Sequence, residues 1–141
     1  MIELLVVILI VGILAAIALP ALLGNQDKAS DADAKSKARG LQAQVEGCYL
    51  EKKDYSDCDS AEEVATASNY QWGSGAGQVQ VMVRPFGIDG AAMAAQSKNG
   101  NTYAILRNLT DSSTSRVCTT ASGRYPDGGC RAGGPYGVGT W

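Results

Sequence analysis

Four cysteines are the residues of this 141-residue chain whose spacing most clearly suggests chemistry. They fall into two close pairs, Cys48 with Cys58 and Cys118 with Cys130. The two competing interpretations are disulfides and a zinc site. Because the chain has no histidine and neither pair has CxxC spacing, disulfides are favoured over zinc. Four cysteines allow three connectivities, and local pairing is the simplest; each loop closed in this way would contribute about 3 kcal/mol.

The other polar residues show no catalytic pattern. Without histidine the chain lacks the commonest general base and any Ser-His or Cys-His pair. The alternating carboxylates of Asp54, Asp57 and Asp59 could offer oxygen ligands to calcium, but they lack the glycine turn and final glutamate of an EF-hand loop. A solvated loop is therefore the favoured interpretation of this cluster. We expect no enzyme activity, no cofactor and no metal.

One carboxylate stands apart from the others, because Glu3 directly precedes an uninterrupted apolar run from Leu4 to Leu23. About twenty apolar residues can cross a bilayer as a helix, so residues 1–23 are predicted to form a transmembrane or filament-core helix. A carboxylate at the end of such a helix indicates a functional group that awaits a cation. The alternative is a helix-start carboxylate that the helix dipole favours by about 0.3–1 kcal/mol.

The helical pattern continues beyond the apolar run to about Lys52, which predicts a rod roughly 75 Å long. In its second half, apolar residues recur at spacings of three and four, so this half should pack against its own chain. Pro20 removes a backbone donor inside the helix and predicts a kink or a locally opened turn. The predicted stripe contains Ala29, Ala32, Leu41, Val45, Cys48 and Tyr49, with Asp31, Lys35, Lys37 and Arg39 largely outside it.

Strand patterns follow the helix. Alternating valines predict a half-buried strand over residues 78–84, and the Asn99-Gly100 turn predicts a hairpin before a strand at residues 102–108. Residues 91–98 and 115–120 are further candidates. The predicted fold is α+β, with the amphipathic half of the helix packed on an antiparallel sheet of three or four strands. Residues 24–141 would form this head, with a loop-rich, disulfide-linked C-terminus. The predicted core residues of the sheet are Val79, Val81, Val83, Ile105 and Val117.

The N-terminal segment IELLVVILIVGILAAIALP, with Glu3, Gly12 and Pro20 in register, closely resembles the N-terminal signature of type IV pilins and of the pseudopilins of type II secretion systems. A softer resemblance covers the C-terminal portion. There NGNTYAILRNL, the following CTT and the closing GxGTW are similar to the globular half of Gram-positive or actinobacterial pilin-like proteins. The resemblance implies an assembly role for the three N-terminal residues.

In this family the glutamate that Glu3 matches neutralises the N-terminal amine of a neighbouring subunit during assembly. The helix between the matching glycine and proline, here Gly12 to Pro20, loses helical order in the filament. Mature members begin with a methylated Phe and carry two more residues before the Ile-Glu pair than this chain does. We therefore expect a sequence that is mature, truncated or started at another codon, and the true first residue and its methylation stay open.

Three function classes compete. The first is a type IV pilin, whose apolar helices bundle into a cell-surface filament that supports adhesion, motility or DNA uptake. The second is a pseudopilin of a secretion system, and the third is a single-pass membrane-anchored domain that never polymerises. The expected partners are identical subunits and, before assembly, the inner membrane and the pilus assembly machinery. A net charge of −2 gives no electrostatic case for nonspecific nucleic-acid binding by the isolated subunit. No specific nucleic acid is predicted as a partner.

Overall fold

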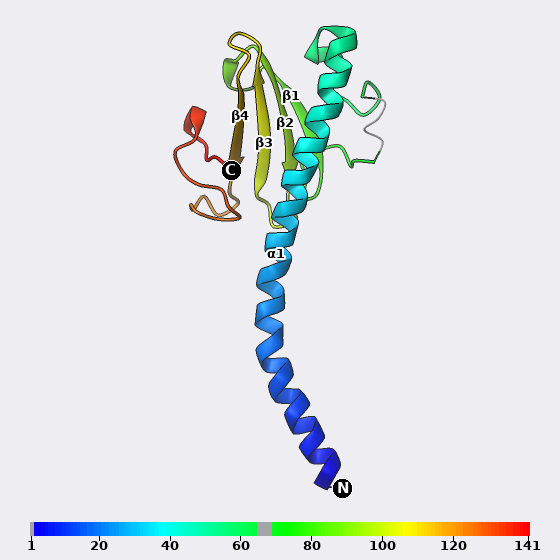
Figure 1. Cartoon of the computed structure of the whole chain (residues 1–141), viewed down its shortest axis with the longest axis vertical. Coiled ribbons are helices and arrows are strands. Elements are labelled where there is room, and N and C mark those ends of the chain that lie inside the picture. Colours follow the sequence, from blue (N-terminus) through cyan, green and yellow to red (C-terminus); the bar gives the residue numbers. More distant parts are fainter. Residues whose placement is uncertain (1, 65–68) are drawn as a thin grey trace.

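The computed structural model describes residues 2–64 and 69–141, which form one long helix and a four-stranded sheet (Figure 1). The helix α1 covers Ile2–Lys52, and about half of its length projects beyond the sheet as a rod. The strands are β1 (Val79–Val83), β2 (Gly90–Gln96), β3 (Thr102–Asn108) and β4 (Thr114–Thr119). Three short 3₁₀ turns lie at Tyr55–Asp57, Pro85–Gly87 and Pro135–Gly137. The α+β fold predicted from the sequence is confirmed.

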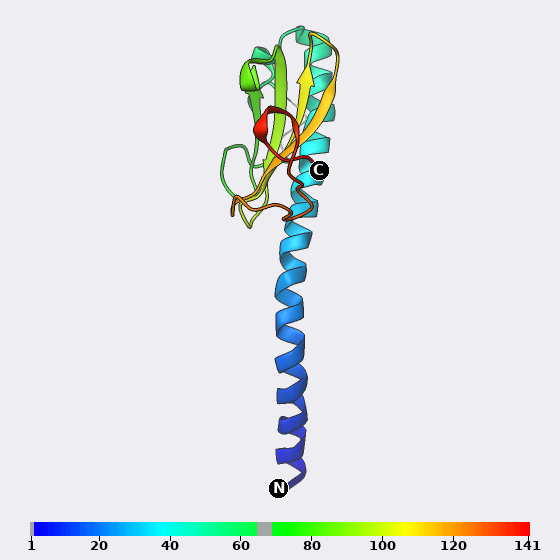
Figure 2. The same ribbon diagram turned by 90° about the vertical axis from the view of Figure 1, so that its left-hand side faces the viewer.

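The backbone of α1 is helical without interruption through Pro20, so the predicted opening of the helix at this residue is wrong for the single subunit. Its 51 residues make a rod of about 76 Å, and Figures 1 and 2 show it curving gently without a break. A proline inside a helix leaves one carbonyl without its usual donor, and a gentle curve is a common response. The loss of helical order expected inside a filament stays a prediction.

The second half of α1 packs on the sheet through a stripe that differs from the predicted one. Ala29 and Ala32 are exposed, whereas Asp31 is buried. The stripe advances by three or four residues at each step, as one face of an α-helix must, and it is offset from the predicted stripe over the first turns. It contains Asp31, Ala34, Ala38, Leu41 and Val45. The small side chains of Ala34 and Ala38 allow the helix axis to lie close to the strands.

The sheet is an antiparallel meander in the order β1-β2-β3-β4. Val79 pairs with Ala95, Met93 with Ile105 and Tyr103 with Cys118, so adjacent strands are joined by short turns. The predicted strands are all present: β3 has the predicted limits, and those of β1, β2 and β4 are shifted by one or two residues. The candidate at residues 91–98 corresponds to β2, which is the most buried strand because its alanines are covered on both faces of the sheet.

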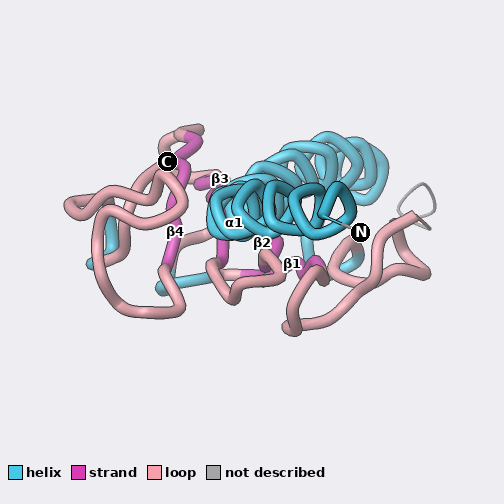
Figure 3. The backbone as a smooth tube through the Cα atoms, turned by 90° about the horizontal axis from the view of Figure 1, so that it is seen from below, coloured by secondary structure: helices cyan, strands magenta, loops and turns pink. Residues whose placement is uncertain are grey.

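The sheet buries apolar side chains on both faces. The face toward α1 carries Val79, Met93 and Tyr103, with Val81 and Val83 partly buried beside them. Val117 is buried as predicted, but it lies on the opposite face with Ala92, Ala104 and Leu106. Viewed along the rod, α1 lies over one face of the strands, and loops extend on both sides of it (Figure 3). The head therefore has a main core under the helix and a smaller one behind the sheet.

The C-terminal segment has no long helix or strand, as predicted. It is held to the sheet by backbone hydrogen bonds in both directions between Cys118 and Gly139, each 2.9 Å long. A second reciprocal pair joins Arg131 and Thr140 at 2.8 and 2.9 Å. These bonds return the chain end to the edge strand β4, where it covers part of the smaller core.

Candidate assembly surface

The most unusual surface of the molecule is the projecting part of α1, residues 2–24, which we call the arm. Its twelve large apolar side chains between Ile2 and Ile17 are all between 47% and 78% exposed. A soluble monomer rarely exposes a continuous apolar patch of more than a few hundred Å². Each such side chain gains about 1.5–3 kcal/mol when it is fully buried. Burial of the arm against another apolar surface is therefore strongly favoured.

Within the part of the chain that the structure describes, no helix is both long enough and apolar enough to cross a membrane.

Glu3 lies in the first turn of α1, at the far tip of the arm. The backbone N–H groups of a first helical turn have no partner within the helix and carry partial positive charge, so a carboxylate is favoured there. This position also places the charge at the end of the molecule that lies farthest from the head. The predicted contact of Glu3 with a neighbouring subunit stays a prediction.

Gly12 and Pro20 lie on the same continuous helix as Glu3, in the part that projects from the head (Figure 1). A Cβ atom added at Gly12 would meet no heavy atom within 4 Å. The single subunit therefore gives no packing reason for glycine at this position. A helix interior favours alanine over glycine by about 1 kcal/mol, so a reason must come from outside the subunit or from flexibility. The side chain of Pro20 lies outside the described residues.

A buried polar cluster fixes α1 to the head just above the arm. Asn101 Nδ2 donates to both carboxylate oxygens of Asp31, at 3.2 and 3.4 Å, and Asn101 Oδ1 accepts from the backbone of Ala121 at 2.9 Å. The Tyr103 hydroxyl donates to the Gly128 carbonyl at 2.9 Å, and Lys35 Nζ donates to the same oxygen at 2.7 Å. Burial, followed by the neighbouring Asp31 carboxylate, raises the pKa of Tyr103 far above its usual range.

This polar cluster joins the helix, the β2–β3 turn and the C-terminal segment at one point. Gly128 has a left-handed φ of +55°, and a Cβ there would stand 2.2 Å from both the Asp31 carboxylate and the Tyr103 hydroxyl. Glycine is therefore required for this close approach. Sequence reasoning missed the cluster because its members are separated by up to about a hundred residues, and because Asp31 looks like an ordinary exposed helix residue.

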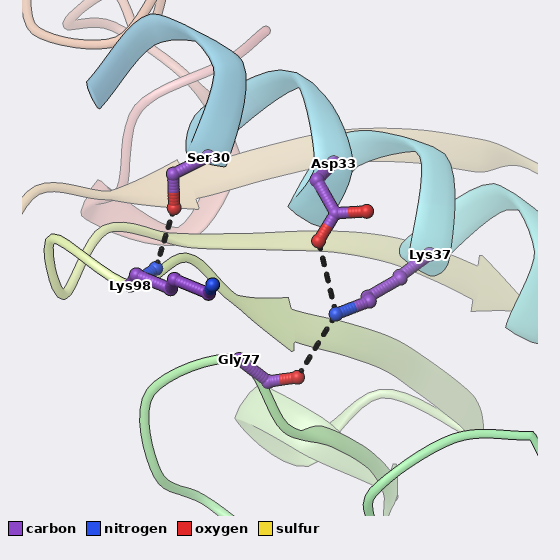
Figure 4. Close-up of polar contacts among 5 residues, drawn as sticks. All are labelled: Ser30, Asp33, Lys37, Gly77 and Lys98. Carbon is purple, nitrogen blue, oxygen red and sulfur yellow. Dashed lines mark hydrogen bonds and ion pairs between the residues drawn. The ribbon is translucent and has the colours of Figure 1, made fainter. Parts of the chain in front are cut away.

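A second set of polar contacts lies nearer the solvent (Figure 4). Ser30 Oγ accepts from the Lys98 backbone at 2.7 Å, and Lys37 Nζ donates to the Gly77 carbonyl at 3.1 Å. Lys37 also pairs with Asp33, one helical turn before it, at 2.9 Å. These contacts connect α1 to the segment before β1 and to the turn after β2, which lie at the same end of the sheet because the two strands are antiparallel. The arm is consequently the continuation of a helix that is anchored along the head.

The two disulfides are the local pairs. Cys48–Cys58 joins the end of α1 to the loop that follows, and next to it the rings of Tyr49 and Tyr55 stack with centroids 4.3 Å apart. Cys118–Cys130 joins β4 to the C-terminal segment. In the first loop Asp54 accepts from the Ser56 backbone at 2.9 Å, and this hydrogen bond lowers the pKa of the Asp54 carboxyl.

Residues 2–64 and 69–141 contain no group of three or more acidic, histidine or cysteine side chains arranged to hold a metal ion. The Asp54 carboxylate is occupied as the cap of the Tyr55–Asp57 turn. On the far side of the sheet, Met82, Phe86, Leu106 and Val138 line a shallow apolar groove of about 120 Å³. The groove is a second exposed apolar surface, in addition to the arm.

The last residue, Trp141, is a functional candidate that the sequence did not single out. Its indole N–H donates to the Val117 carbonyl at 2.9 Å, and its ring meets the ring of Tyr103 edge-on at 5.9 Å. Lys35, Arg39 and Arg116 place their cationic groups 5.9, 5.1 and 5.4 Å from the indole centre. Cation–π attraction of this kind holds the three cations together on one surface.

A disulfide-linked α+β head on a long helix with an exposed apolar arm defines the class of pilin-like subunits. Over 139 residues the chain is 31% identical to the fimbrial protein EcpC of Eikenella corrodens, and the match covers 93% of this chain and 88% of the relative. The chain belongs to this family of fimbrial proteins. No family model matches the sequence, and no solved structure matches it. As a family member, the chain is a fimbrial structural subunit.

Proposed function

We propose that this chain is the subunit of a type IV pilus and that it polymerises through its arm into a filament on the cell surface. The observation that carries the proposal is the exposed row of apolar side chains from Ile2 to Ile17 on a helix anchored in the head. Bundling the arms of many copies along one axis would bury this row and leave the heads outside. The role is structural rather than catalytic.

Glu3 supports the same proposal from its position at the tip of the arm. In a bundle of parallel arms, a carboxylate surrounded by apolar side chains is costly unless a cation lies beside it. The N-terminal amine of a neighbouring copy is a cation of the kind that this carboxylate requires. The low dielectric of the bundle would strengthen the pair compared with water.

The pseudopilin alternative predicts the same subunit but a different product. A pseudopilin would form short filaments inside the cell envelope, whereas a pilin would form long ones that can be sheared from the cells. The two disulfides are typical of an exported domain and fit either location. The similarity to a fimbrial protein supports the extracellular filament. Insertion of residues 1–23 into the inner membrane before assembly, and help from the assembly machinery, stay predictions.

The test is a comparison of Glu3→Ala with Asp27→Ala, which removes an exposed carboxylate from the same helix outside the apolar row. The expected result is that Glu3→Ala gives at least a tenfold lower yield of sheared filaments, with normal disulfides in the subunit. Asp27→Ala should keep the wild-type yield. A wild-type yield for Glu3→Ala would reject the role of Glu3. A lack of filaments in wild-type cells would reject the pilin proposal itself.

A further inference from the structure

The charges of this protein are separated along its long axis. We call the end of the head from which the arm leaves the lower half, and the end where α1 stops at Lys52 the upper half (Figures 1 and 2). Residues 27–39, Lys98 and residues 116–131 extend from the lower end of the head to its middle, where Arg116 lies opposite Ile105 of β3. They carry eight basic and four acidic side chains, a net charge of +4. Residues 46–63, 84–89 and 107–111 of the upper half carry four basic and nine acidic ones, a net charge of −5. Together with Glu3 these residues account for the net charge of −2.

The positive charge of the lower half is concentrated around Trp141. We call Lys35, Arg39, Arg116 and Arg131, together with the indole that they surround, the basic patch. The two backbone hydrogen bonds between Arg131 and Thr140 place Arg131 next to Trp141. In the described part of the chain the only ion pair is the one between Lys37 and Asp33. Among the described residues, none of the four cations of the basic patch forms an ion pair.

The negative charge of the upper half is concentrated in the segment that the first disulfide closes. Residues 51–63, the acidic segment, contain six carboxylates and two lysines. Glu51, Asp57 and Glu62 are exposed. Burial, followed by the neighbouring Glu63 carboxylate, raises the pKa of Asp59. A cation brought to this segment would relieve this repulsion.

We infer that the basic patch of one subunit docks on the acidic segment of the next copy along the filament. This inference rests on the proposed function. Parallel copies that share one axis make a head-to-tail contact, in which a lower half faces an upper half, and such contacts build open helical assemblies. Opposite charges on the two halves favour this arrangement and disfavour the contact of like ends. The charge separation thus supplies direction and register, while the arms supply most of the buried apolar surface.

Nucleic acid is the other class of partner that a basic patch could suit, and two observations favour a second copy. The upper half offers a complementary surface of almost equal and opposite charge on the same molecule. The indole is engaged by Val117, Tyr103 and three cations, so its ring is not a free platform for stacking a base. Nucleic-acid binding is therefore an outcome of the test rather than part of the proposal.

The experiment is a charge-reversal exchange in the full chain, with sheared filament yield as the measurement. The lower variant is Arg116→Glu with Arg131→Glu, the upper variant is Glu51→Lys with Glu62→Lys, and the third variant combines all four changes. All four side chains are exposed, so folding should persist, and non-reducing gels would verify both disulfides in each variant. The lower and upper variants should each reduce the yield at least tenfold. The combined variant should return to within threefold of wild type.

The matched control is Lys52→Glu with Arg84→Glu, which reverses two exposed cations of the upper half. It changes the net charge by the same amount as the lower variant but leaves the basic patch intact, so the yield should stay within threefold of wild type. Salt gives a second readout, because screening acts over about 10 Å at 0.1 M. Wild-type filaments should dissociate more readily as salt rises, and filaments of the combined variant should behave alike.

Three results would overturn the inference. The first is an unchanged yield in the lower and upper variants, and the second is a combined variant with no better yield than either of them. The third is that wild-type filaments bind a labelled DNA duplex and that the lower variant loses this binding at an unchanged yield. In each case wild-type filaments are still present, so the proposed function would stand while the docking contact fails. Absence of wild-type filaments would instead reject the proposed function.

Discussion

Asn101 donates hydrogen bonds to both carboxylate oxygens of Asp31, across 70 residues of sequence. Asp31 is 3% exposed and Asn101 is 1% exposed, so the contact is closed to water. It lies where α1 leaves the head, at the β2–β3 turn. A force on the arm would therefore pass to the sheet at this point.

Replacing Asp31 with alanine should destabilise the head by about 1–3 kcal/mol, because a buried donor then loses its acceptor. Asp33→Ala is the control. It removes a carboxylate from the same helical turn, and its ion pair with Lys37 is exposed and worth less than about 1 kcal/mol. Both changes have the same effect on intrinsic helix propensity, so the difference reports on burial. The measurement is urea unfolding of the full chain in detergent. Equal losses in the two variants would contradict the account.

The pKa of Tyr103 makes the stability of the head sensitive to alkaline pH. Burial raises this pKa above the ordinary tyrosine value of about 10, so the folded state favours the neutral phenol. The resulting stability is fully present below pH 10 and is lost as the pH rises above it. The Tyr103→Phe variant should therefore lose less stability than wild type between about pH 9 and pH 11. Parallel stability curves for the two proteins over this range would contradict the prediction.

The disulfide Cys118–Cys130 should stabilise the C-terminal segment rather than the filament core. Replacing both cysteines with serine should cost about 3 kcal/mol, since the closed loop is short. Trypsin should then cut sooner after Arg124 and Arg131, while filaments persist under mild reduction because the arms contain no cysteine. The rate of tryptic cleavage and the filament yield are the two measurements. Filaments that dissolve under mild reduction would mean that disulfides join subunits.

A larger side chain at Gly12 should affect filament yield without affecting the stability of the single subunit. In the single subunit a larger side chain at this position meets open space, so Gly12→Leu should leave the head as stable as in wild type. In a bundle of arms the added side chain would have to fit between neighbouring helices, and the filament yield should fall at least tenfold. Ala15→Leu, at another exposed position of the arm, is a matched change in size. Gly12→Leu filaments at wild-type yield would show that glycine is not needed for packing.

The sequence predicts the local features of this fold well. The alternating valines of β1, the Asn-Gly turn before β3 and the spacing of the cysteines each depend on residues close together in the chain. Such patterns identify the helix, the strands and the disulfide pairs. They also indicated the arm, because a long apolar run needs no tertiary information to be recognised.

The sequence does not reveal features that depend on distant residues. The burial of Asp31 requires Asn101, and the position of Trp141 requires Lys35, Arg39 and Arg116. Val117 was predicted as core, but the alternation within β4 cannot say which face of the sheet the helix covers. Pro20 was expected to interrupt the helix, yet one missing donor is a small loss in a rod of 51 residues. The separation of charge appears only when the fold assigns each charge to an end of the head.

If the arm assembles this chain into a filament, that filament should be present on the surface of the producing cells. Electron microscopy of material sheared from the producing cells tests it most directly, with mass spectrometry of the same fraction that includes the peptide around Glu3. The account predicts long thin filaments in which this chain is the main protein. Its N-terminal peptide would also give the true first residue and any methylation. A chain that stays with the cells, with no filaments in the sheared fraction, would contradict the account.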